Sequence, residues 1–149
     1  MNSLFTSADR EALSRRLATL EPEALHQWGK MDPAQMLRHC ALSLVDPLGE
    51  RAVKQAFLGK LVTPFIRGGV FGDKPFRRSA PTDSAYVVSG PSDFEAERSR
   101  LAVLIDRLVQ RGPAKTEGMI HPFFGRLSGV AWGRLVYKHL DHHLRQFGV

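Results

Sequence analysis

Residues 129–148, GVAWGRLVYKHLDHHLRQFG, have the pattern of one long amphipathic helix. Ser128 precedes the segment as a candidate N-cap, and Gly148 provides a stop near its end. Apolar side chains recur every three or four positions and form a single stripe: Trp132, Val136, Leu140, Leu144 and Phe147. A long helix with one broad apolar face predicts an all-α protein, in which this face packs against other helices.

Two histidines interrupt the apolar face of this helix. His139 and His143 lie on or beside the stripe, one turn apart, where a plain helical bundle carries Leu or Ile. Imidazoles at positions i and i+4 project from the same face and can share one metal ion. Burying two rings costs free energy unless their nitrogens have partners, which a metal supplies. We predict metal ligation; the alternative is two ordinary histidines at the core edge, each bonded to a carbonyl or carboxylate.

Three earlier helices are predicted from start signals and helical spacing. The first covers residues 7–20. The second covers residues 32–45, with Asp32 as its N-cap, a proline at the first helical position and a glutamine three residues after the cap. The third covers residues 92–112, with Ser92 as the cap of a Ser-Asp-Phe-Glu capping box and a Gly-Pro pair at its end.

Residues 47–91 form a long connection between the second and third of these helices. A further helix is expected over residues 51–66, and the Gly- and Pro-rich remainder, residues 67–91, is expected to be extended. Residues 86–88, Tyr-Val-Val, resemble a short strand without an obvious partner. A helical bundle needs such a crossover when two successive helices point the same way, so the sequence predicts a four-helix bundle with a crossover.

A third metal ligand is expected on another helix, because two histidines do not make a stable site. His39 lies in the middle of the second predicted helix, among inward-facing apolar residues. Together with His139 and His143 it gives a three-histidine site with an open coordination position, the arrangement of catalytic zinc sites. His142 is the alternative to His143 as a metal ligand, because it lies three residues after His139 and could also pair with it. We prefer His143, because His142 points toward the edge of the stripe.

Other candidate side chains have weaker signals. His121, in the loop before the last helix, either covers the mouth of a site or has no role, and His26 is interpreted as structural. Cys40 is expected in the core as a small apolar residue. Three polar residues near the ligands either orient them or are simple surface residues: Gln35, Ser43 and Gln146.

The composition excludes several classes of protein. A length of 149 residues, with 43% hydrophobic and 24% charged side chains, fits one globular domain over residues 1–149. The single cysteine excludes an internal disulfide framework and suits a reducing compartment. Neither a secretory signal nor an apolar stretch long enough to cross a bilayer is visible, so we expect a cytoplasmic protein without a membrane partner.

The net charge of +6 raises the question of nucleic-acid binding. The basic residues are scattered in ones and twos, and no recognition-helix, zinc-finger or aromatic RNA-binding signature accompanies them. We therefore do not expect a nucleic-acid partner. A homodimer is expected, because symmetric dimers are the commonest oligomers.

Four short motifs, taken together, resemble a known family. Residues 35–40, QMLRHC, and residues 137–148, YKHLDHHLRQFG, resemble the DinB-like superfamily of metalloenzymes. Residues 28–31, WGKM, and 121–128, HPFFGRLS, resemble one bacterial branch of it, of unknown function. The motifs are short, but their order and spacing extend over most of the chain, from residue 28 to residue 148.

The resemblance implies a four-helix bundle in up-down-down-up order, with a crossover between the second and third helices. It also implies a divalent ion, often zinc or nickel, bound by His39, His139 and His143. Relatives in the superfamily include S-transferases and isomerases that use low-molecular-weight thiols.

We therefore expect a metal-dependent enzyme of the thiol-transfer type, acting on a small-molecule substrate. Arg38 or Arg145 would meet a carboxylate of the thiol cofactor. A hydrolase that uses metal-bound water is a close variant. The alternative from another class is a non-catalytic bundle that binds a small ligand or partner.

Overall fold

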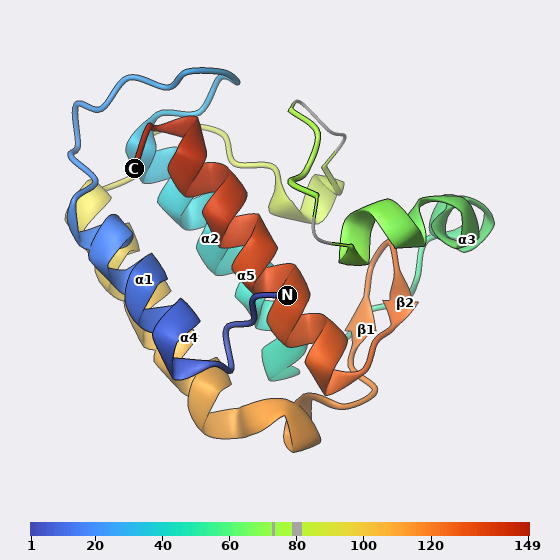
Figure 1. The fold of residues 1–149 in the computed structure, drawn as a ribbon. Helices are drawn as coiled ribbons and strands as arrows, with labels where there is room; N and C mark the ends of the chain where they lie inside the picture. The colour runs from blue at the N-terminus through green and yellow to red at the C-terminus, as the bar shows by residue number, and fades with distance from the viewer. Residues whose placement is uncertain (73, 79–81) are drawn as a thin grey trace.

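The computed structural model describes residues 1–72, 74–78 and 82–149, and it is mostly helical (Figure 1). The elements in these residues are α1 (Ser7–Ala18), α2 (Pro33–Leu48), α3 (Phe57–Phe71), a short 3-10 turn η1 (Ser84–Tyr86), α4 (Phe94–Thr116), β1 (Ile120–His121), β2 (Gly125–Arg126) and α5 (Gly129–Gln146). The predicted helical class is confirmed. The antiparallel pair β1–β2, which precedes α5, was not predicted.

The predicted N-cap residues of α2 and α5 form their hydrogen bonds. The Asp32 carboxylate accepts a hydrogen bond from the Gln35 amide at 2.8 Å, and the Gln35 side chain accepts one from the Asp32 amide at 3.1 Å. Ser128 Oγ accepts from the amide of residue 131 at 3.2 Å. Helix α2 ends three residues later than predicted, because the left-handed Gly49 (φ 73°) terminates it after Leu48.

Helix α4 differs from its prediction at both ends. Its cap is Asp93, not Ser92, and the Asp93 carboxylate accepts from the amide of residue 96 at 2.7 Å. A charged acceptor is favoured over a hydroxyl at the positive end of a helix. At Gly112 (φ 72°) the helix bends and then continues to Thr116, so the predicted stop is a kink.

The middle of the chain departs most from the predictions. The helix expected over residues 51–66 begins only at Phe57, because the residues before it bond to a distant loop: the Gln55 side chain and the Ala56 amide donate to carbonyls of residues 123 and 122. The same helix runs to Phe71, into the stretch expected to be extended. The strand predicted over residues 86–88 is wrong, since the chain there forms η1 and its exit. Residues 73 and 79–81 of the expected extended connection lie outside the described residues.

The core lies between α1, α2, α4 and α5. Helix α2 packs along α4 and α5, and α5 also contacts α1, α3 and α4 (Figure 1). The apolar stripe predicted for the last helix is buried at every position. Gly129 allows the start of α5 to approach the kink of α4, because an added Cβ would lie 1.9 Å from the carbonyl oxygen of Pro113. Fully buried core side chains include Leu4, Leu20, Leu37, Leu44, Leu101, Leu108 and Trp132.

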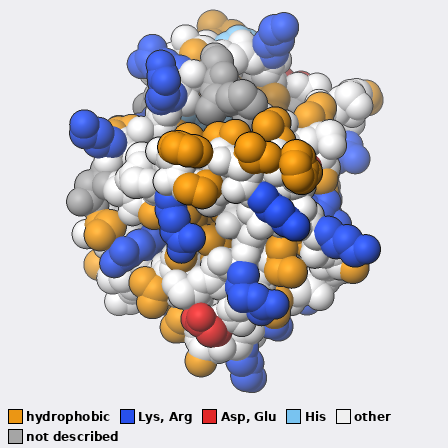
Figure 2. All heavy atoms as spheres, turned by 90° about the vertical axis from the view of Figure 1, so that its right-hand side faces the viewer, with side chains coloured by type: hydrophobic (Ala, Val, Ile, Leu, Met, Phe, Trp, Pro, Cys, Tyr) orange, Lys and Arg blue, Asp and Glu red, His pale blue; other side chains and the backbone are white. Residues whose placement is uncertain are grey.

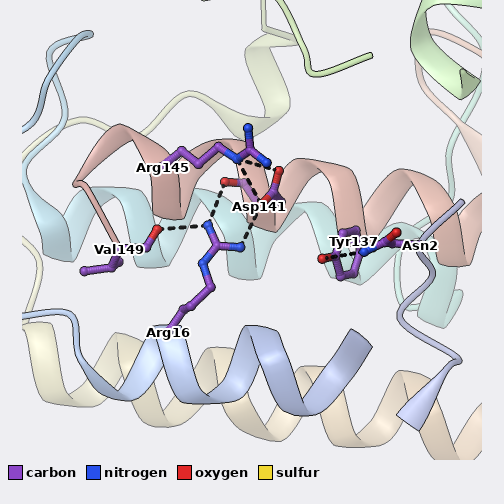
Figure 3. A network of polar contacts seen from close by, with 6 residues as sticks. All are labelled: Asn2, Arg16, Tyr137, Asp141, Arg145 and Val149. Atoms are coloured by element: carbon purple, nitrogen blue, oxygen red, sulfur yellow. Dashed lines mark hydrogen bonds and ion pairs between the residues drawn. The ribbon is translucent and has the colours of Figure 1, made fainter. Parts of the chain in front are cut away.

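A polar network fixes α1 against the outer side of α5 (Figure 3). The Arg16 guanidinium donates to the Asp141 carboxylate at 2.7 Å and to the backbone oxygen of Val149 at 2.9 Å. Arg145 contacts the same carboxylate at 3.0 Å. With α1 held on one side and α2 on the other, the face of α5 that carries His139 and His143 is turned toward α2.

Within the described residues, none of the helices combines the length and apolar character needed to cross a lipid bilayer.

Candidate metal centre

The structure brings the three predicted histidines together. His39 comes from the middle of α2, and His139 and His143 come from successive turns of α5. One ring nitrogen from each lies within 4.8 Å of the others, and the ring centroids are 4.7 to 4.9 Å apart. His39 and His143 are buried, whereas His139 is partly exposed. We call these three residues the histidine centre.

The protonation of His39 is fixed by the backbone of η1. Its Nδ1 lies 2.7 Å from the carbonyl oxygen of Tyr86. Because a carbonyl can only accept, Nδ1 of His39 carries the proton and Nε2 has a free lone pair.

The protonation of His143 follows from its glutamine neighbour. Its Nδ1 lies 2.9 Å from Oε1 of Gln146, and the amide nitrogen of Gln146 lies 2.6 Å from the carbonyl oxygen of Trp28. The second contact requires the amide nitrogen to face Trp28, so the amide oxygen must face the imidazole. Nδ1 of His143 therefore donates, and its Nε2 is unprotonated.

The protonation of His139 is set by Ser43 in the same way. Ser43 Oγ donates its one proton to the carbonyl oxygen of Cys40 at 2.7 Å, and it lies 3.2 Å from Nδ1 of His139. The hydroxyl must therefore accept from this imidazole. All three histidines donate from Nδ1, which leaves three unprotonated Nε2 atoms.

The facing nitrogens of His39 and His139 are placed to share a cation. Their Nε2 atoms are 3.0 Å apart, a hydrogen-bond distance, yet with these tautomers neither carries a proton. Two nitrogens that bind one zinc ion at about 2.0–2.1 Å in tetrahedral geometry are separated by roughly 3.4 Å. Metal-binding histidines also usually donate a hydrogen bond from the ring nitrogen that does not bind the metal, as these three do from Nδ1. The residues therefore fit a divalent metal ion.

Burial keeps the histidine centre neutral. Desolvation is the largest cause that lowers the pKa of each ring, and for His139 and His143 repulsion from the neighbouring histidines adds to it. The pKa of His143 falls to about 3. Protons therefore compete poorly for these nitrogens at neutral pH, which favours metal ligation.

The remaining histidines lie outside this group of ligand atoms. His142 packs its ring against Trp28 and Phe76, with centroids 5.7 and 5.9 Å away. His121 accepts hydrogen bonds at Nδ1 from the amides of residues 123 and 124, and burial lowers its pKa to about 4. His26 is exposed, and its ring meets the edge of the Phe147 ring.

The predicted orienting residues are only partly right. Gln146 contacts His143, and Ser43 contacts His139 on the facing helix. Gln35 does not contact the centre; it closes the capping box of α2. The two arginines expected to meet a cofactor carboxylate are engaged within the protein, Arg38 with Glu97 at 4.0 Å and Arg145 with Asp141.

One buried group beside the centre was not predicted. Asp46, on α2, is almost fully buried and accepts two hydrogen bonds from Arg51 at 2.9 Å, and a third from the Tyr86 hydroxyl. This places Tyr86 so that its carbonyl reaches His39. Asp46 follows His39 by seven residues, two turns along the same face of α2, which is a sequence signal for such a group.

Cys40 does not supply a thiol to the centre. It is buried with 1% of its surface exposed, and its Sγ lies 3.7 Å from Sδ of Met36. Burial raises the pKa of its thiol far above the ordinary value, so it stays protonated. The prediction that Cys40 packs in the core is confirmed.

The chain belongs to a family described as a protein of unknown function (DUF1569), whose model matches residues 2–148. No curated protein and no solved structure matches it. The family establishes kinship over nearly the whole chain and assigns no activity.

Proposed function

We propose that the chain is a metalloprotein that binds one divalent ion through the Nε2 atoms of His39, His139 and His143, and that it is an enzyme. The observation that carries the proposal is the arrangement of hydrogen bonds: each Nδ1 is occupied, so each of the three clustered rings has an unprotonated Nε2. Three imidazoles favour a borderline ion such as zinc or nickel over magnesium or calcium, which prefer oxygen ligands.

We further propose that the reaction depends on a low-molecular-weight thiol. A three-histidine site of this kind leaves one coordination position open, at which a thiolate or a water molecule is stabilised. The buried, protonated Cys40 is unsuited to be the nucleophile, so a reacting thiol would have to come from a small molecule. The protein's own groups hold and orient the ligands: Tyr86 and Gln146 through acceptor oxygens, and Ser43 through its hydroxyl.

The proposed relationship is to the DinB-like superfamily. In this interpretation α1, α2, α4 and α5 are the four helices of an up-down-down-up bundle, and α3 lies in the crossover between the second and third. The position of the ligands in the second and last of these helices, and the contacts between those helices, support it.

Metal content tests the proposal. The purified protein and the variants His143→Ala and His26→Ala are analysed for bound metal, and then titrated with zinc and nickel. We expect near-stoichiometric metal in the wild type and in His26→Ala, and loss in His143→Ala. Protein that neither contains nor takes up either ion would leave a ligand-binding bundle as the better account.

Thiol dependence then separates two reaction classes. Turnover of electrophilic substrates by the metal-loaded protein is compared with and without added thiol. A requirement for thiol supports the transferase class, whereas thiol-independent cleavage of esters or amides would indicate a metal-dependent hydrolase.

A further inference from the structure

Helix α3 exposes four large apolar side chains on one side. The exposed fractions are 78% for Phe57, 65% for Leu58, 56% for Leu61 and 87% for Phe65. At 100° per residue these four positions lie within an arc of about 100° of the helix surface. We call them the α3 apolar face. Isolated exposed apolar residues need no explanation, but a contiguous group on one helix indicates an interaction surface.

The opposite side of α3 explains how the helix is held. Gly59 and Thr63 are its buried residues, and Thr63 donates to the carbonyl oxygen of Phe123 at 3.2 Å. An added Cβ at Gly59 would lie 2.3 Å from the same oxygen, so only glycine fits there. The C-terminal end of the helix is also held, because Val70 and Phe71 pack against the core and the Phe71 ring meets Phe124. These contacts leave the four apolar side chains of the other side directed outward.

Positive charge surrounds the α3 apolar face. The segment from Arg51 to Gly72 contains four basic residues and no acidic one, and Lys54, Lys60 and Arg67 in it are exposed. Figure 2 shows this side of the molecule: hydrophobic side chains gather near the centre, and Lys and Arg side chains ring them, with hardly any acidic side chain. An occupant of this surface must be apolar where it meets the helix and negative around it.

These charges argue against a second copy of the chain as the occupant. A symmetric dimer through α3 would bring the same basic residues of two copies together, without acidic partners in the segment to offset them. The helix also stands away from α1, α2 and α4, at the side of the molecule (Figure 1). A projecting apolar helix with a cationic border matches the helices that lie in the interface of a bilayer.

We propose that α3 binds the surface of an anionic lipid bilayer, with Phe57, Leu58, Leu61 and Phe65 inserted among the head groups. The exposed Lys54, Lys60 and Arg67 would contact lipid phosphates, each adding to binding while it lies near the charged surface. The prediction of no membrane partner rested on the lack of a spanning segment, and a helix of 15 residues lying along the surface needs none. The proposal is independent of the histidine centre.

Sedimentation with vesicles tests the proposal. The purified protein is mixed with vesicles of phosphatidylcholine alone, or of phosphatidylcholine with phosphatidylglycerol, at low and at high ionic strength. Binding is expected only to the anionic vesicles, and it weakens as salt is raised. Phe65→Ser is expected to reduce the partition coefficient by roughly tenfold, the effect of losing one large inserted side chain.

Matched variants control for general hydrophobicity and charge. Val103→Ser removes a 56% exposed apolar residue from α4 and should leave binding unchanged. Lys60→Gln with Arg67→Gln should weaken anionic binding, whereas Arg15→Gln with Lys30→Gln, at exposed positions of α1 and the following loop, should weaken it less. In a Phe65→Trp variant, the added tryptophan emission should shift to shorter wavelength with anionic vesicles.

Three results would overturn the proposal. The first is the absence of binding to anionic vesicles at low salt, and the second is binding that Phe65→Ser leaves unchanged. The third is a dimer, detected by analytical ultracentrifugation without lipid, that Phe65→Ser dissociates. This third result would assign the α3 apolar face to self-association.

Discussion

The histidine centre and α3 depart from the usual arrangement of a globular protein in opposite directions. Around the centre, polar groups are buried: His39, His143, Asp46 and Gln146 each have less than a tenth of their surface exposed, and each has hydrogen-bond partners. On α3, large apolar groups are exposed. Local exceptions to the rule of apolar inside and polar outside are where function is expected.

The two regions differ in how their residues depend on one another. Removing one member of the buried network leaves its partner unsatisfied, so single changes there carry a large penalty. The side chains of the α3 apolar face are 56 to 87% exposed, so single changes there should matter for binding more than for stability. Variants at Asp46, His121, Gln146 and Phe65 test this contrast.

The largest effect is expected at Asp46. The Asp46→Ala variant leaves the Arg51 guanidinium and the Tyr86 hydroxyl without their acceptor, and we expect a loss of about 3 kcal/mol in unfolding free energy. Urea unfolding measures it. The control Glu95→Ala breaks the exposed pair with Arg98 and should cost less than about 1 kcal/mol. Equal losses in the two variants would remove the contrast between buried and exposed polar groups.

The second effect is a loss of stability in acid at His121. Its pKa is lowered from 6.5 to about 4, chiefly by burial. Below pH 6.5 the unfolded chain binds a proton at His121 that the folded chain does not, so the contribution of His121 to stability falls as the pH falls from 6.5 to 4 and levels off below that. The contribution is about 3 kcal/mol at most.

Urea titrations of metal-free protein across this pH range measure the contribution of His121. His121→Gln should make the decline less steep, while His26→Gln, at an exposed position, should not. Part of the decline should remain in His121→Gln, because burial also lowers the pKa of the histidines of the centre. A decline that stays equally steep in His121→Gln would assign the acid sensitivity to other groups.

The third effect concerns the orientation of a metal ligand. Gln146→Leu removes the acceptor of His143 Nδ1, and we expect zinc affinity to fall roughly 10- to 100-fold, as for other outer partners of metal-binding histidines. Competition with a chromophoric chelator measures the dissociation constant. Gln110→Leu, at an exposed position of α4, should leave it unchanged, and an equal drop in both variants would point to a general loss of folding.

The smallest effect is expected on α3. Phe65→Ser should change the unfolding free energy by no more than about 0.5 kcal/mol, because the side chain is 87% exposed. Leu108→Ala, at a fully buried position of α4, should cost about 2–5 kcal/mol under the same conditions. A large loss for Phe65→Ser would mean that the apolar face is covered within the fold in solution.

The elements that the sequence predicted well have local causes. The N-terminus of α2 depends on Asp32 and Gln35 within one turn, and that of α5 depends on Ser128. The i, i+4 spacing places His139 and His143 on one face whatever surrounds them. These contacts lie within a few residues, so a single sequence contains what is needed to infer them.

The elements that the sequence predicted poorly depend on distant contacts. The start of α3 is set by bonds from residues 55 and 56 to the loop before α5, nearly 70 residues away. The role of Tyr86 depends on Asp46 and His39, which approach it only through tertiary packing. Ser43 was expected near the ligands, but only the packing of α2 on α5 directs its hydroxyl to His139.

The separation of the ligands along the chain has a consequence for folding. His39 and His139 are 100 residues apart. An ion shared by them would be a removable cross-link, closing a loop whose entropy loss in the unfolded chain corresponds to roughly 4–5 kcal/mol in the chain-entropy account. A chelator, and not a reductant, would open this link. The stability of the folded chain would therefore depend on the concentration of free metal around it.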